Sequence, residues 1–184
     1  MDLVSTFFNI DVLIRYSPLL LQGLGRTVLL GLLSIVFGLI GGLMLALVRL
    51  YAARPFRILA IAYIDVFRAL PVLVWLVIVY YALPFVGIRF SPFVAACFAL
   101  ATVSAAYAAE IFRAGIEAVP RGQFEAADAL GLHAYRRMRH VVLPQAIRVV
   151  IPPLTNNSIN VMKDTALASV CLLYTSDAAD DSLR

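Results

Sequence analysis

The chain has 184 residues, of which 62% are hydrophobic and 14% charged, and its net charge is +4. A soluble domain is about 45–50% apolar and about 25% charged, and a chain of this length cannot bury so large an apolar excess. These values, with a mean hydropathy of +0.92, exclude a soluble globular domain and a disordered chain, and they indicate a single integral membrane domain.

The types of residue present exclude several classes of function. Lys163 is the only lysine, so the chain holds no GxxxxGK[ST] loop for ATP, and no Ser/His/Asp set or carboxylate pair indicates an enzyme. The two cysteines, Cys97 and Cys171, form no disulfide framework. His133 and His140 have no cysteine nearby, so we expect no metal and no cofactor. The arginines lie between apolar runs, which indicates membrane topology rather than nucleic-acid binding.

The first predicted membrane span covers residues 19–48. Its core, Thr27–Val48, is 22 residues without a charge, and about 20 apolar residues cross a bilayer core of about 30 Å. No basic segment precedes it, so we expect an uncleaved span and not a signal peptide. Small residues four apart predict a face that packs closely on another helix. They are Ser34, Gly38, Gly42 and Ala46.

Three further spans are predicted over residues 56–86, 92–116 and 141–166. The middle one of these is rich in alanine, which favours a central place in a helix bundle. In the last one, Pro144 suits the first turn of a helix. The pair Pro152-Pro153 predicts a bend or break further along the same span.

The connection over residues 117–140 is too charged to lie in hydrocarbon. Pro120 is expected to begin a short helix there, and Gly131 is expected to end it. Arginines are frequent in this connection and in the one after the first span, whereas only Arg89 follows the second span. The positive-inside rule therefore places the first and third connections in the cytoplasm and the N-terminus outside.

Charged residues at the end of the third span are spaced for ion pairs. Glu110 and Arg113 are three residues apart, and Arg113 and Glu117 are four apart, so each pair shares a helix face. We expect a structural ladder of ion pairs at the cytoplasmic end of this helix. The alternative is a group of charges that gates the transport path.

The last residues differ in character from the rest of the chain. Residues 171–181 read CLLYTSDAADD, and translation of the DNA adapter of a transposase-based sequencing library produces this string, with Asp or Glu at its last position. We therefore expect residues 171–184 to be a non-native tail and residues 1–170 to be the membrane domain, with the natural protein continuing past Val170. The alternative is a genuine short polar tail.

One pattern in the third connection carries functional information. Glu125-Ala126-Ala127, Gly131 and Leu143-Pro144 form E-A-A-x(3)-G-x(11)-L-P, which resembles the EAA loop of permease subunits in bacterial ABC importers. The flanking residues, including 107–116, extend the match. The chain resembles the polar amino-acid branch of that superfamily, the histidine/glutamine-type permeases, over about residues 18–170.

The resemblance implies a fold, a function and partners. The fold is expected to be the all-α integral membrane domain of type I ABC importers (MetI-like), a five-helix core whose fifth helix is missing from this chain. The function is expected to be that of a permease subunit in an ATP-driven amino-acid importer of the bacterial inner membrane. The expected partners are an ATP-binding cassette subunit that hydrolyses ATP, a second permease subunit, an extracytoplasmic substrate-binding protein and the lipid bilayer, with no nucleic acid.

In this family the helix of the EAA loop sits in a groove of the ATPase subunit. Phe124, Ala127 and Leu130 are spaced to share one face of that helix, and the small side chains of Ala126 and Ala127 are expected to let a partner approach. The residues that the resemblance assigns to ATPase coupling are Phe124, Glu125, Ala126, Ala127, Leu130, Gly131, Leu143 and Pro144. The alternative is an amphipathic helix on the lipid surface, held by the arginines that follow it.

Two more blocks resemble the family, Arg68-Ala69-Leu70-Pro71 in the second span and Pro152-Pro153-Leu154 in the fourth. The residues expected to line a substrate path are Arg68, Pro71, Tyr107, Asn156, Asn160, Lys163 and Thr165. Measured from Pro144, Asn156 lies about 18 Å along the helix and Lys163 about 28 Å, so Lys163 has snorkelling to the interface as its alternative. Departures from the family pattern are Ala69 for glycine, Trp75 for glutamine, Asn157 for an acid and Ala166 for serine.

Other classes of protein remain as alternatives. A permease of an ABC importer for another small polar solute would share every feature above. A secondary transporter or channel would need acidic groups for ion coupling within its spans, and Asp65 is the only acid near the first turns of a span. A membrane enzyme would need a catalytic cluster at one interface, and none is visible in the sequence.

Overall fold

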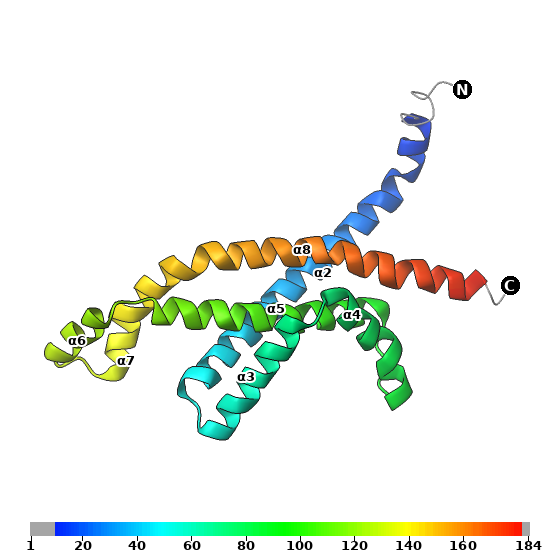
Figure 1. Cartoon of the computed structure of the whole chain (residues 1–184). Helices are drawn as coiled ribbons and strands as arrows, with labels where there is room; N and C mark the ends of the chain where they lie inside the picture. The colour runs from blue at the N-terminus through cyan, green and yellow to red at the C-terminus, as the bar shows by residue number, and fades with distance from the viewer. Residues whose placement is uncertain (1–9, 182–184) are drawn as a thin grey trace.

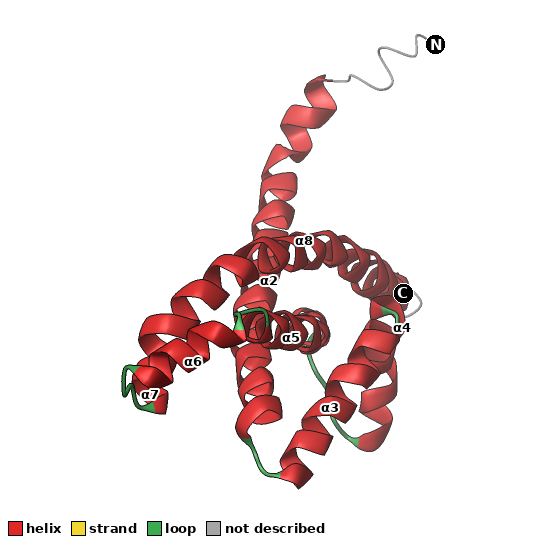
Figure 2. Cartoon of the chain, turned by 60° about the vertical axis from the view of Figure 1, so that its left-hand side comes forward, coloured by secondary structure: helices red, strands yellow, loops and turns green. Residues whose placement is uncertain are grey.

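A computed structural model describes the backbone of residues 10–181 and the side chains of residues 14–168. Within that range the chain consists of helices and short loops (Figure 2). The helices are α2 (Ile10–Tyr51), α3 (Arg54–Ala69), α4 (Val72–Val77), α5 (Pro92–Glu117), α6 (Arg121–Ala129), α7 (Ala134–Arg137) and α8 (Leu143–Asp181). Three shorter helical turns lie between them, η1 (Ile78–Ala82), η2 (Leu83–Val86) and η3 (Met138–Val142).

The centre of the bundle is α5. It contacts both α2 and α8 along its length, and α6 and α7 lie at one end of the pair that α5 forms with α8 (Figure 1). The buried residues of α5 are mostly alanines, which allow neighbouring helices to approach closely. The central place predicted for the alanine-rich span over residues 92–116 is therefore confirmed.

The predicted small-residue face of α2 packs on α5. All four of its members are buried: Ser34, Gly38, Gly42 and Ala46. A Cβ atom at Gly38 would lie 2.4 Å from the Ser104 Oγ, and one at Gly42 would lie 2.5 Å from the Ala108 Cβ. Only a hydrogen atom fits at these two positions, so the spacing correctly predicted a close helix–helix seam.

The predicted second span, over residues 56–86, is bent rather than straight. α3 and the helical run Val72–Val86, which comprises α4, η1 and η2, are bent by 105° relative to each other. Leu70 precedes Pro71 and takes an extended conformation with ψ 132°, which ends α3. Ala69 is still helical, and the only described residues with positive φ are glycines, so the break does not require the family's glycine at this position.

Trp75 joins the bent span to α5. Its indole N–H donates to the Thr102 Oγ1 at 2.9 Å. Its ring packs edge-on against Phe67, with 4.9 Å between the ring centroids, so it contacts both arms of the bend. Where the family commonly has glutamine, this chain therefore keeps one polar contact and adds aromatic packing.

Two leucine–proline pairs are each preceded by a π turn. The N–H of Leu83 bonds to the carbonyl of Ile78, five residues back. The N–H of Leu143 bonds in the same way to the carbonyl of Met138. A proline ring clashes with the carbonyl four residues before it, and the wider turn relieves that clash. Pro144 thus lies in the first turn of α8, as predicted, although η3 already extends the helical path before it.

α8 runs through Pro152-Pro153 without interruption and is curved, so of the predicted bend or break only the bend occurs (Figure 1). It also continues past the predicted end at residue 166 to Asp181. By length and composition, α2 and α5 can each cross a membrane, and α3 with α4 can form a third, bent span. α8 is long enough to cross a membrane but is more polar than α2, α5 and the bent pair. The predicted fourth span is therefore less apolar than the other three.

Candidate functional site

Gly131 ends α6 at the end of the bundle where α5 finishes and α8 begins (Figure 1). Its φ is +70°, and its N–H bonds to the carbonyl of Asp128 at 2.9 Å. The N–H of Leu132 bonds to the carbonyl of Ala127 at 3.1 Å. These two bonds form a Schellman cap, whose left-handed position favours glycine. The predicted role of Gly131 as the end of the short helix is confirmed.

One face of α6 packs onto the bundle. Ala127 is buried, and Phe124 is half-buried against a cluster that includes Val142 and Ala146. Leu130 was predicted to share this face, but 79% of its surface is exposed. It follows the last residue of α6 and has a ψ of 5°, so the helical periodicity no longer applies to it. The predicted three-residue face is therefore corrected to two residues.

The opposite face of α6 is open. Glu125 and Ala126 are exposed, and Leu130 presents its apolar side chain at the tip. We call these three residues the outward α6 surface. Leu143 and Pro144 are also exposed, in the first turn of α8. The residues predicted for ATPase coupling thus divide into an inward pair and a set that a partner can reach.

Polar contacts fasten α6 to the segments that follow it. Arg137 forms an ion pair with Asp128 and lies over the ring of Phe124, with its Cζ 5.7 Å from the ring centroid. Gln145 Nε2 donates to Gln123 Oε1 at 3.2 Å, which joins α8 to α6. Arg137, one of the arginines that the lipid-surface alternative uses, is therefore engaged within the chain.

The predicted ladder of ion pairs is present and has one more member. Arg113 pairs with both Glu110 and Glu117. Arg49, at the end of α2, also pairs with Glu110, with 2.7 Å between its Nη1 and the Oε2. The spacing of residues along α5 predicted the ladder, but it could not predict a partner 61 positions away. The network ties the ends of α2 and α5 together.

A polar cavity of about 300 Å³ lies between α4, α5 and α8. Its polar lining residues are Ser104, Tyr107, Asn157, Asn160, Lys163 and Asp164. Val72, the first residue of α4, also lines it. The break in the bent span and the polar residues of α8 therefore meet at one place.

The structure brings three of the predicted path residues into this cavity, namely Tyr107, Asn160 and Lys163. Arg68 lies beside it, with its Cζ 5.5 Å from the centroid of the Tyr107 ring. Pro71 directly precedes α4 and is not part of the lining. Asn156 is exposed outside the cavity, and Thr165 lines a different one, because successive residues of a helix point about 100° apart.

Two further lining residues, Asn157 and Asp164, were not predicted for the path. Asn157 is buried, and its Nδ2 donates to the Ser104 Oγ at 3.2 Å. Among residues 14–168, neither Asp164 nor Lys163 forms an ion pair. The sequence spacing could have identified both residues. Asn157 lies three residues before Asn160 and Asp164 lies four residues after it, so all three share one helix face.

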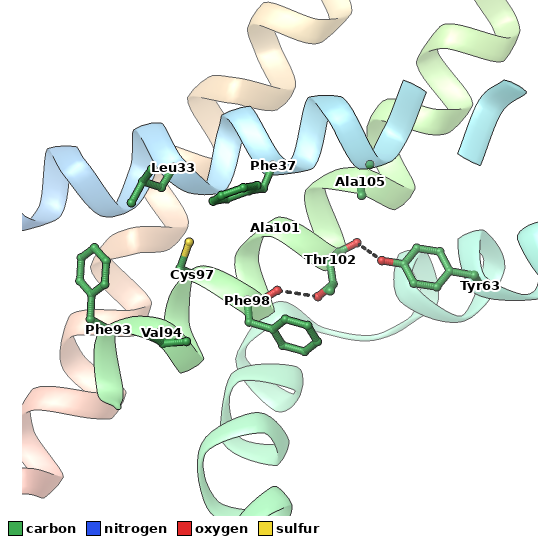
Figure 3. A pocket seen from close by; sticks show the side chains of 11 residues that line it. Leu33, Phe37, Tyr63, Phe93, Val94, Cys97, Phe98, Ala101, Thr102 and Ala105 are labelled. Atoms are coloured by element: carbon green, nitrogen blue, oxygen red, sulfur yellow. Dashed lines mark hydrogen bonds between the residues drawn. The ribbon is translucent and has the colours of Figure 1, made fainter. Parts of the chain in front are cut away.

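A second, apolar pocket of about 540 Å³ lies between α2, α3 and α5 (Figure 3). Phe37, Phe93 and Phe98 surround it. The hydroxyl of Tyr63 donates to the carbonyl of Thr102 at 2.9 Å, so its polar atom is already paired. None of its described lining residues is charged. This pocket does not suit a charged solute, whereas the cavity beside α4 is lined by polar and charged residues of α5 and α8 and is the candidate transport site.

Comparison with known proteins agrees with this geometry. The sequence matches the family described as binding-protein-dependent transport system inner membrane component over residues 16–176. It is 40% identical over 164 residues to the putative glutamine transport system permease protein GlnP of Rickettsia bellii, which covers 87% of this chain and 75% of that protein. It is 42% identical over 158 residues to the L-cystine transport system permease protein TcyB of Bacillus subtilis, covering 86% and 68%.

The fold is also found in solved structures. The crystal structure of an amino acid ABC transporter with histidines matches with a TM-score of 0.82 and 38% identity, over 94% of this chain and 83% of that one. An inward-facing structure of the MetNI methionine ABC transporter matches with a TM-score of 0.71 over 86% of this chain and 76% of that one, and at 22% identity it supports the fold alone. The predicted MetI-like fold is confirmed. The chain belongs to the family of binding-protein-dependent transport system inner membrane components, the permease subunits of ABC importers.

Proposed function

We propose that this chain is the permease subunit of an ATP-driven amino-acid importer. Glutamine and L-cystine appear in the names of relatives at 40% and 42% identity, and the similar solved structure at 38% identity is an amino acid ABC transporter. A single chain cannot enclose a path, so it works with a second permease subunit. A substrate-binding protein delivers the amino acid from outside, and ATP is hydrolysed on a separate cassette subunit.

The observation that carries this proposal is the two-sided character of α6. Its inward side, Phe124 and Ala127, packs on the bundle, while the outward α6 surface is free for a partner. Leu130 presents its apolar side chain on this surface, at a position that the family resemblance assigns to ATPase coupling. A push on α6 by the ATPase subunit therefore reaches the ends of α5 and α8 directly. This arrangement supports coupling of ATP-driven closure to a switch between inward-open and outward-open states.

The cavity between α4, α5 and α8 has the chemistry for a zwitterion. Lys163 offers a cation for the α-carboxylate, and Asp164 offers a carboxylate for the α-ammonium group. Both side chains lack an ion-pair partner among residues 14–168, so neither charge is already neutralised. Asn160 and Tyr107 add neutral hydrogen-bonding groups to the same lining.

The orientation follows from charge. Arg49, Arg54 and Arg57 cluster at the turn between α2 and α3, and more arginines follow α5. We infer that both of these connections face the cytoplasm, which places the N-terminus outside and α6 on the side where the ATPase subunit works.

The coupling assignment is tested by retention of the ATPase subunit on the purified permease. Leu130→Asp and Glu125→Lys change the outward α6 surface without touching the buried side. The control is Tyr135→Asp, at the same end of the bundle, where the side chain is 70% exposed and occupies one of the unspecified positions of the motif. We expect both test variants to lose the ATPase subunit and the control to keep it. Retention in both test variants would refute the assignment.

The path assignment is tested by uptake kinetics of the complete transporter. Lys163→Gln and Asp164→Asn are each expected to raise KM about tenfold, the effect of losing one charged hydrogen bond. Asn156→Ala and Thr155→Val are matched controls on the same helix, since Asn156 is exposed outside the cavity and the Thr155 hydroxyl bonds to the Ile151 carbonyl. If the two controls change KM and the two test variants do not, the substrate path lies elsewhere.

A further inference from the structure

A cavity of about 620 Å³ lies at the end of the bundle opposite α6. The start of α2, the start of α5 and the residues of α8 near Ala168 enclose it. Its rim carries Gln22, Arg26 and Ser91, and Leu30 and Ala96 belong to an apolar wall. It shares no lining residue with the cavity proposed for transport.

Helix lengths place this cavity at the boundary of the bilayer. Arg26 and Arg49 flank the 22 uncharged residues Thr27–Val48, which rise about 33 Å, close to the bilayer core of about 30 Å. Arg49 pairs with Glu110, so these two charges mark one boundary. Arg26 then marks the other boundary, and the apolar wall of the cavity extends from it into the hydrocarbon.

The charge at this rim belongs to Arg26. Within residues 14–168, no carboxylate forms an ion pair with Arg26. A guanidinium at headgroup depth, above an apolar wall, matches a ligand with an anionic head and a hydrocarbon tail. Arginine binds a phosphate diester through two parallel N–H···O bonds, while Gln22 and Ser91 add neutral hydrogen-bonding groups at the same rim.

We propose that this cavity binds an anionic phospholipid of the adjacent leaflet. The phosphate lies at Arg26, and the first part of one acyl chain lies along Leu30 and Ala96. Such a lipid would bridge the starts of α2 and α5, which meet at this cavity. The proposal does not depend on which solute the protein carries.

The chain offers variants that separate the two parts of this site. Gly23 lines the cavity, and a Cβ atom there meets nothing within 4 Å, so Gly23→Leu adds an apolar side chain at a lining position whose Cβ has open space. Gly25→Leu is its control, because Gly25 also meets nothing within 4 Å but does not line the cavity. Arg26→Gln removes the charge at the rim. Arg89→Gln is the control for that change, since Arg89 is exposed and outside the lining.

The experiment measures lipid retention by the complete transporter. The complex is reconstituted in vesicles of phosphatidylglycerol and phosphatidylcholine, extracted in mild detergent, and analysed by native mass spectrometry for bound lipid. We expect phosphatidylglycerol to be retained in preference to phosphatidylcholine. Arg26→Gln is expected to reduce that preference about tenfold, and Gly23→Leu to remove the retained lipid, while both controls resemble the wild type.

Three results would overturn the proposal. One is retention of phosphatidylglycerol that Arg26→Gln and Gly23→Leu leave unchanged. Another is displacement of the lipid by inorganic phosphate alone, which would make the site one for a free anion. The third is loss of the second permease subunit in Gly23→Leu with lipid retention intact, which would show that a protein surface covers the cavity.

Discussion

Replacement of Gly42 by alanine tests the seam between α2 and α5. The added Cβ would lie 2.5 Å from the Ala108 Cβ, 2.9 Å from the Ala105 carbonyl oxygen and 3.0 Å from the Ala109 nitrogen. Favourable contacts between such atoms lie at about 3.5–4.0 Å. Two of the three atoms belong to the backbone, so no change of rotamer relieves the clash and α2 must move away by roughly 1 Å.

The magnitude follows from a comparison with Gly25→Ala on the same helix. A Cβ at Gly25 meets nothing within 4 Å, so that variant gains only helix propensity, about 0.5–1 kcal/mol. Gly42→Ala has the same gain in propensity but also overpacks the seam, which costs about 1–3 kcal/mol. The free energies of unfolding of the two variants should therefore differ by that overpacking cost. Each kcal/mol corresponds to about 2–4 °C in unfolding temperature.

The assay is the fraction of intact transporter that survives heating in detergent, measured by size-exclusion chromatography. We expect Gly42→Ala to lose the complex at a lower temperature than Gly25→Ala. Equal unfolding temperatures for the two variants would mean that α2 and α5 are not in close contact at this position.

Three other predictions use the same assay. Gly131→Val forces a branched side chain into the left-handed cap and should lower the free energy of unfolding by at least about 1–2 kcal/mol. Gly122→Val should lower it less, because a Cβ at Gly122 meets nothing within 4 Å, and equal losses of stability would contradict the cap. Arg49→Gln and Glu110→Gln should show a coupling of about 0.5–1 kcal/mol in a double-mutant cycle, and additive effects would mean that this ion pair contributes nothing. Ser104→Ala should cost about 1–3 kcal/mol because it leaves the buried amide of α8 without its partner, and an unchanged unfolding temperature would argue against that bond.

Features that depend on local spacing were predictable from the sequence. The residues four apart in α2, the left-handed glycine after α6 and the ladder on α5 each follow from helix geometry and steric limits. Gly38, Gly131 and Arg113 therefore lie where the sequence predicted. The EAA pattern and its flanks predicted the family for the same reason, since their spacing is specific.

Features that depend on contacts between distant segments were not predictable. Leu130 is the cap residue that follows α6, so its side chain leaves the face that helical spacing predicted for it. The partnership of Arg49 with Glu110, and of Asn157 with Ser104, required knowledge of how the helices cross. The pair Pro152-Pro153 predicted a bend or a break without deciding between them, and α8 accommodates both rings by curving.

Amino-acid transport by this chain, coupled to an ATPase subunit, is tested by uptake of radiolabelled glutamine and other amino acids into vesicles that contain the complete transporter and its binding protein. We expect accumulation only when ATP is present, and loss of that accumulation in Glu125→Lys. Accumulation that a proton or sodium gradient drives without ATP, and that Glu125→Lys leaves intact, would contradict this coupling.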